Sequence, residues 1–149
     1  MAHNSVGIEI SEMRKRLRAA VDRSRRAAAA RRLELNEAAE AYERFLAELA
    51  GPLVRMLANA LRAEGFGFTV FAPARGLKLA SSRTGEDFIE FVLDTSARQP
   101  TAMLRVNRGR GRRVVQHERP VREGTPVNQL TEEDVLSALL EEIGPFVER

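Results

Sequence analysis

The first 50 residues constrain the fold most, because they contain no proline and their only glycine is Gly7. Alanine, arginine, glutamate and leucine dominate this stretch, and all four favour helix. We therefore predict one continuous helix from Ser11, which serves as its N-cap, to Ala50. At 1.5 Å per residue, a helix of about 40 residues is roughly 60 Å long, too long for the rest of the chain to cover.

Apolar side chains in this helix recur with the spacing of helices that pair lengthwise. Two series, offset by four residues, each repeat every seven residues, which is the a/d pattern of a coiled coil. The pattern is weak at Ser24, Ala28 and Arg31 and stronger from residue 35 to 49. We expect these positions to pair with a second helix. The predicted seam comprises Leu17, Val21, Ala28, Leu35, Ala38, Tyr42, Phe45 and Leu49.

The remainder of the chain reads as a small α+β domain. Gly51 and Pro52 are typical of a helix end followed by a new helix, which we predict over 52–64. After Gly65 the apolar period changes to two, and short connections predict a four-stranded antiparallel meander. The alternating segments lie at 66–71, 77–81, 87–94, 101–106 and 112–121.

A C-terminal helix is predicted over 131–143, with Thr131 as N-cap and Asp134 three residues later. Its expected buried stripe is Val135, Leu136, Leu139, Leu140 and Ile143. The predicted fold is therefore α+β, with residues 1–50 forming a long helical arm and residues 51–149 the domain. We expect the two shorter helices to cover one face of the sheet, and the other face to be polar around Glu90 and Asp94.

The net charge of +3 is unevenly distributed along the chain. Residues 1–32 carry nine basic and three acidic side chains, whereas residues 33–65 carry three basic and six acidic ones. In an antiparallel helix pair, the basic part of one chain would lie beside the acidic part of the other. A basic helical surface can equally follow a phosphate backbone. The charge pattern is compatible with both interpretations.

The segment RVNRGRGRR, residues 105–113, is a second basic element. We predict that it closes a hairpin, with Gly109 and Gly111 supplying the positive φ values of a tight turn. Its arginines either form a solvated turn or contact phosphates, and no interleaved aromatic residue supports base stacking. The candidate phosphate contacts are Arg105, Arg108, Arg110, Arg112 and Arg113 in this segment, and Arg14, Arg18 and Arg25 in the first helix.

Few residues support catalysis. The chain has no cysteine, and its histidines are His3 and His117. A catalytic histidine needs an orienting carboxylate and a nucleophile nearby. Glu118, next to His117, faces the other side of the strand, and nothing local brings Ser81, Ser82 or Asp94 to this histidine. Glu90 and Asp94 would stand about 13 Å apart on a strand, too far to act on one bond. GFGF and RGRGRR lack the contexts of nucleotide-binding loops, so we expect no cofactor, metal or catalytic site.

These observations predict a non-enzymatic, oligomeric or partner-binding accessory protein that uses its long N-terminal helix. The partner is either a second copy or a dedicated protein. The alternative is a nucleic-acid-binding protein that contacts phosphates through the basic helix and the arginine hairpin. The sequence predicts no transmembrane segment and no secretory signal, and the absence of cysteine suits the cytoplasm. A membrane-surface helix would lack aromatic anchors.

Overall fold

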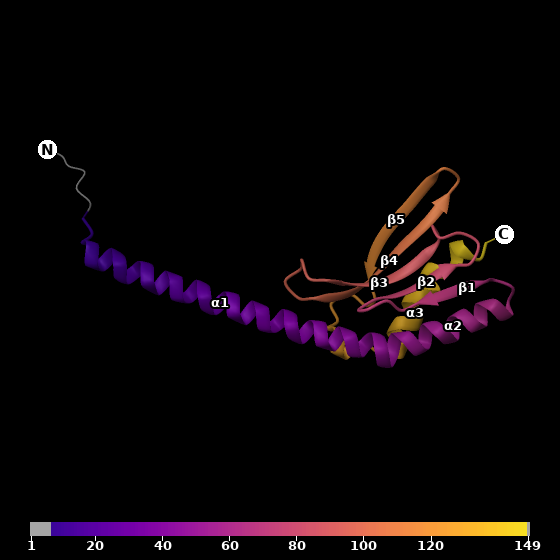
Figure 1. Ribbon diagram of the computed structural model, residues 1–149, viewed down its shortest axis with the longest axis horizontal. Helices are drawn as coiled ribbons and strands as arrows, with labels where there is room; N and C mark the ends of the chain where they lie inside the picture. Colours follow the sequence, from indigo (N-terminus) through magenta and orange to yellow (C-terminus); the bar gives the residue numbers. More distant parts are fainter. Residues whose placement is uncertain (1–6, 149) are drawn as a thin grey trace. The chain divides into compact units, whose positions relative to one another are not determined.

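The computed structural model describes residues 7–148 and has the predicted α+β class. Helix α1 (Ile10–Phe45) is followed by the π-helical segment η1 (Leu46–Ala50) and by α2 (Gly51–Ala63). A five-stranded antiparallel sheet comes next, and helix α3 (Glu132–Ile143) follows it (Figure 1). Short 3₁₀ turns lie at Val127–Gln129 and Gly144–Phe146. Contacts divide the chain into two compact units, of which the first ends at Glu37 and the second begins at Ala38.

The sheet is a meander in which sequential strands are neighbours. The predicted count of four strands is wrong, because each of the five alternating segments forms a strand of its own. The strands are β1 (Phe68–Phe71), β2 (Leu77–Ser81), β3 (Phe88–Asp94), β4 (Thr101–Arg110) and β5 (Arg113–Pro120).

The core lies between one face of the sheet and helices α2 and α3, which cover that face as predicted (Figure 1). Strand alternation explains this, because Leu79, Ile89 and Val106 are opposite one another across the register and point the same way. In α3 one predicted stripe position is wrong: Leu140 is 52% exposed, while Ala138 is 1% exposed. Val135, Ala138 and Leu139 form the buried face of α3, and Leu140 lies outside this face.

Gly51 and Pro52 do not end the helix, contrary to the prediction. Gly51 has right-handed helical angles (φ −57°, ψ −55°), and its N–H donates to the carbonyl of Leu46, five residues back. A proline ring crowds the carbonyl four residues before it and offers no N–H, so the wider π-turn lets the chain pass Pro52 without a break. At the other end, Ser11 lies inside α1, which begins at Ile10, so it is not the N-cap.

The start of α3 is confirmed in detail. The backbone N–H of Asp134 donates to Thr131 Oγ1 at 3.2 Å, and the Thr131 N–H donates to Asp134 Oδ2 at 3.0 Å. This reciprocal pair is the capping box that the sequence predicted. Arg122 adds a contact, with its Nη1 3.2 Å from Asp134 Oδ1.

Candidate functional site

The second half of the predicted helix-pairing seam lies in the core of its own chain. Tyr42 is 4% exposed and Phe45 is 6% exposed, and their ring centroids are 6.1 Å apart. Phe45 also meets Phe91 of β3, with 6.0 Å between the centroids. Ala38 and Leu49 are half-buried. The fold of residues 38–148 therefore already covers these side chains, fully at Tyr42 and Phe45 and in part at Ala38 and Leu49.

The first half of the seam is exposed to solvent. Leu17 is 60% exposed and Val21 is 37% exposed. Ile10, one heptad before Leu17, is 65% exposed. We call these heptad positions the apolar stripe, which consists of Ile10, Leu17, Val21, Ala28 and the half-buried Leu35.

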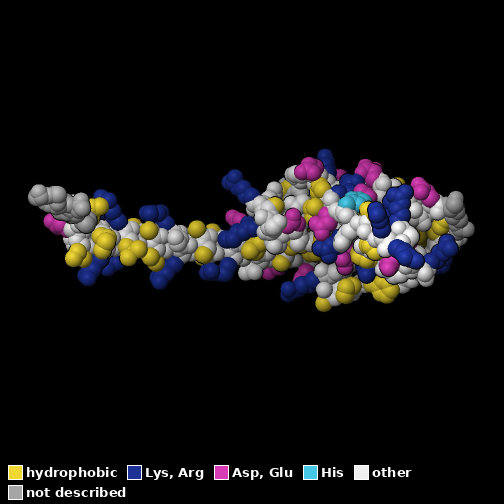
Figure 2. All heavy atoms as spheres, turned by 90° about the horizontal axis from the view of Figure 1, so that it is seen from above, with side chains coloured by type: hydrophobic (Ala, Val, Ile, Leu, Met, Phe, Trp, Pro, Cys, Tyr) yellow, Lys and Arg dark blue, Asp and Glu magenta, His cyan; other side chains and the backbone are white. Residues whose placement is uncertain are grey.

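Basic side chains flank the apolar stripe and also interrupt it, since Arg14 and Arg31 stand at heptad positions of the seam themselves. Figure 2 shows hydrophobic and basic side chains interspersed along this part of the helix. Arg14, Arg18 and Arg25 are exposed, and none of them makes an ion pair with the described residues. They are therefore free to meet an acidic or phosphate-bearing partner.

In the arginine hairpin, Arg105 has a structural role. It stands between Glu90 and Glu118 in the strand register. Its Nε lies 2.9 Å from Glu118 Oε1, and its Nη1 lies 3.5 Å from Glu90 Oε1. The hydrogen bond with Glu118 raises the pKa of Arg105. The three charged side chains lie on the sheet face away from the helices. Because Arg105 is paired with two carboxylates there, it is not available to bind a phosphate.

The two hairpin glycines serve different purposes, which corrects the prediction that both supply positive φ. Only Gly111 has a positive φ, +65°, in the two-residue turn between β4 and β5. A positive φ at the first turn position alone is typical of type II′. Gly109 instead lies where the 82–87 loop packs closely: a Cβ there would come 2.7 Å from Glu86 Oε2, the end of a flexible side chain that can move aside.

The loop of residues 82–87 packs against the end of β4. Asn107 Nδ2 donates to the carbonyl of Glu86 at 2.5 Å, and the Gly109 N–H donates to Asp87 Oδ1 at 2.8 Å. These bonds hold Arg83 of the loop beside the hairpin. Sequence reasoning missed Arg83, because a lone loop arginine carries no signal until the strand register is known.

Arg83, Arg108 and Arg110 together line a cavity of about 490 Å³, which we call the arginine cavity. By strand alternation, Arg108 and Arg110 share the helix-bearing face with Val106. Arg112 and Arg113 are exposed at the hairpin end and do not line the cavity. The remaining lining residues are Ser81, Thr84, Asp87, Gly109, Pro145, Phe146 and Glu148.

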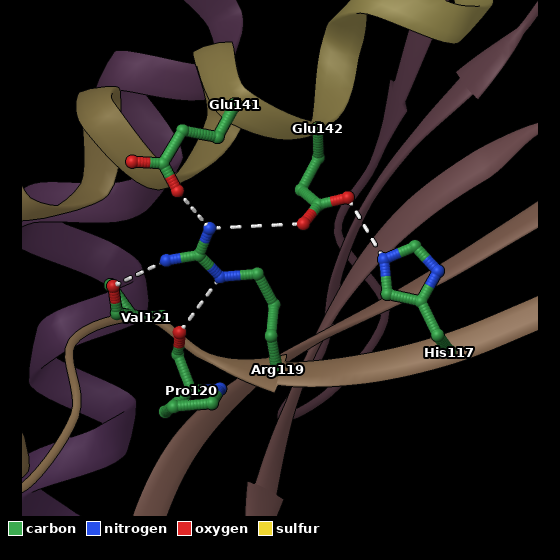
Figure 3. Close-up of polar contacts among 6 residues, drawn as sticks. All are labelled: His117, Arg119, Pro120, Val121, Glu141 and Glu142. Atoms are coloured by element: carbon green, nitrogen blue, oxygen red, sulfur yellow. Dashed lines mark hydrogen bonds and ion pairs between the residues drawn. The ribbon is translucent and has the colours of Figure 1, made fainter.

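A second polar cluster joins the edge strand β5 to α3 (Figure 3). His117 Nε2 lies 2.9 Å from Glu142 Oε2. Arg119 Nη1 contacts Glu141 and lies 3.7 Å from Glu142 Oε1, while its Nε donates to the Pro120 carbonyl at 3.0 Å. Glu142 is thus the carboxylate partner of His117, and the cluster fastens an edge strand to a helix. His3 lies outside the described residues.

Within residues 7–148, no three metal-ligating side chains gather into a cluster. None of the helices described is both long enough and apolar enough to cross a membrane. Comparison of the chain with family models, curated proteins and solved structures found no match.

Proposed function

We propose that this chain is a non-enzymatic protein that acts by pairing the N-terminal part of α1 with the same helix of a second copy. The observation that supports this is the apolar stripe, where Ile10 and Leu17 are 65% and 60% exposed at heptad spacing. Single exposed apolar side chains are ordinary, but a seven-residue repeat of them is the pattern that a partner helix buries.

The proposed pairing surface is shorter than the predicted seam and differs in charge. Because Tyr42 and Phe45 are buried, only the seam positions up to residue 35 are open to a partner helix. An antiparallel pair over this region would place the basic residues 14–32 of both copies together, rather than basic beside acidic.

The arrangement of the arginines favours parallel pairing. Arg18, Arg25 and Arg32 repeat every seven residues along one flank of the apolar stripe, at the e positions. In an antiparallel pair these flanks would face each other. In a parallel pair each arginine flank faces the opposite flank of its partner, which carries Ala20 and Ala27.

Light scattering across a range of protein concentrations tests the proposal. The wild-type chain is expected to form a dimer, and the double variant Leu17→Glu, Val21→Glu to be a monomer. Leu33→Glu is the matched control, since Leu33 is 59% exposed but lies off the apolar stripe. This control should dimerise like the wild type. A wild-type chain that stays monomeric at every concentration would overturn the proposal.

Nucleic-acid binding is the second candidate, supported by the unpaired Arg14, Arg18 and Arg25. The effect of salt concentration on binding distinguishes nucleic-acid binding from helix pairing. Binding to a phosphate backbone weakens steeply as salt rises, because counterions are released. Pairing of two basic helices should instead strengthen, because salt screens their repulsion. If no oligonucleotide binds at low salt, or if replacing these three arginines by alanine leaves binding unchanged, this candidate is wrong.

A further inference from the structure

We propose that the arginine cavity binds the terminal phosphate group of a small molecule that also carries an apolar group. This site belongs to residues 81–148 and involves neither the apolar stripe nor the exposed arginines of α1. It therefore stands or falls independently of helix pairing.

The charges in the cavity favour an anion. Three arginines, Arg83, Arg108 and Arg110, and two acidic residues, Asp87 and Glu148, line the cavity, which gives a net charge of 3 − 2 = +1. Asp87 Oδ1 already accepts the Gly109 N–H. None of the three guanidinium groups makes a hydrogen bond or ion pair with another described residue.

Arg108 is the central group of the site. The residue is half-buried, and its guanidinium has no anionic partner among the described residues. A phosphate can supply that partner through short, charge-assisted hydrogen bonds, and a guanidinium can make two such bonds at once. A half-buried arginine without a partner is therefore the feature that points to an anionic ligand.

The polar frame of the cavity is fixed by its own hydrogen bonds. Ser81 Oγ accepts the Arg83 N–H at 3.2 Å, and Thr84 Oγ1 accepts the Glu86 N–H at 3.2 Å. Both hydroxyls line the cavity and keep an O–H that can donate to a phosphate oxygen. With the loop also bonded to Asn107 and Gly109, little ordering remains to oppose binding.

The surroundings argue for a small molecule and against a polymer. A smaller cavity of about 130 Å³ shares Arg108, Pro145 and Phe146 with the arginine cavity, and Val106 and Val115 add to its apolar wall. An apolar group next to the phosphate could occupy this recess. A nucleic-acid strand would bring further phosphates past the carboxylates of Asp87 and Glu148, which would repel them.

Titration of the full chain with phenyl phosphate and with inorganic phosphate, followed by calorimetry or NMR, tests the site. Phenyl phosphate should bind with one-to-one stoichiometry and more tightly than inorganic phosphate. Arg108→Ala should weaken phenyl phosphate binding at least tenfold. The matched control is Arg112→Ala, on the same hairpin but outside the cavity, and its binding should stay within twofold of the wild type.

Arg83→Ala guards against a folding artefact, because Arg83 is an exposed loop residue whose loss removes no core contact. It should also weaken phenyl phosphate binding, while the Leu17→Glu, Val21→Glu variant should bind normally. The proposal would be overturned if neither phenyl phosphate nor inorganic phosphate bound at millimolar concentration. So would tighter binding of a single-stranded oligonucleotide without a terminal phosphate, weakened equally by Arg112→Ala and Arg108→Ala. Equal affinity for the two phosphates would rule out the apolar group.

Discussion

At the scale of single residues, Tyr42 shows how a heptad position becomes part of a core. Its ring is 4% exposed, and its hydroxyl has no hydrogen-bond partner among the described residues. Burial raises the pKa of this hydroxyl, with the charge of Glu90 adding to the effect. Burial of the Tyr42 ring thus stabilises the fold, whereas the buried hydroxyl does not.

Tyr42→Phe should therefore raise the free energy of unfolding by about 1 kcal/mol, because it removes a buried and unsatisfied hydroxyl while keeping the ring. Urea denaturation of the wild type and the variant measures this difference. Tyr42→Ala is the contrasting change, and it should destabilise the protein by about 3–5 kcal/mol through loss of the ring. A Tyr42→Phe variant that is less stable than the wild type would mean that the hydroxyl makes a bond.

Individual glycines mark the limit of prediction at this scale. The sequence indicated a turn at Gly111, and the structure confirms its positive φ. The reason for Gly51 was not predictable, because it depends on an atom that the fold brings close, the Leu46 carbonyl oxygen. Composition shows that a glycine is present but not which neighbour requires it.

At the scale of elements, periodicity predicted most of what forms. The change from a helical period to a period of two after Gly65 located the sheet, and the Thr131–Asp134 spacing located the start of α3. The π-helical segment at Leu46–Ala50 was not predictable, since a hydrophobic pattern reports which face is buried and not which carbonyl each N–H meets. Glycine followed by proline was therefore interpreted as a helix end.

Gly51→Ala tests the π-helical segment. A Cβ would lie 2.7 Å from the Leu46 carbonyl oxygen, a backbone atom that cannot move aside, so we expect a loss of about 1–3 kcal/mol in the free energy of unfolding. Gly144→Ala is the matched control, because its helical angles and open surroundings should make it more stable by about 0.4–1 kcal/mol. Thermal and urea unfolding measure both, and equal effects would contradict the close contact at Gly51.

The capping box of α3 should give the protein a specific dependence on acid. The hydrogen bond from the Thr131 N–H, aided by the Thr131 hydroxyl and by Arg122, holds the pKa of Asp134 below its usual value. A lowered folded pKa means that the stabilisation is present above about pH 4, the ordinary aspartate pKa, and is lost as pH falls through the lower folded value. Unfolding of Asp134→Asn should therefore depend less on pH in that acidic window than unfolding of the wild type. If the free energy of unfolding changed with pH in the same way in both proteins, Asp134 would not contribute to the acid dependence.

At the scale of the whole molecule, the candidate sites were predictable only in part. The sequence drew attention to the heptad and to the hairpin arginines. It could not show that Arg105 is neutralised between Glu90 and Glu118, or that Arg83 joins Arg108, since both depend on how strands pair across the sheet. Nor could it separate heptad positions that the chain covers itself from those it leaves exposed.

Phe45 and Leu17 occupy equivalent d positions, yet Phe45 is 6% exposed and Leu17 is 60% exposed. Phe45→Ala should lower the free energy of unfolding by about 3–5 kcal/mol, because it opens a cavity beside Phe91. Leu17→Ala should change it by less than about 0.5 kcal/mol, since alanine suits an exposed helix position. Denaturation of dilute, monomeric protein measures both.

Dimer formation should depend on Leu17 and not on Phe45, the reverse of the free energy of unfolding. Leu17→Ala removes a side chain from the apolar stripe, so it should weaken dimer formation in light scattering even though the monomer remains folded. A stable, folded Leu17→Ala chain that dimerises as well as the wild type would show that the exposed half of the heptad does not serve as the interface. Leu17→Ala and Phe45→Ala, both at d positions of the heptad, thus separate the contribution of this pattern to folding from its contribution to assembly.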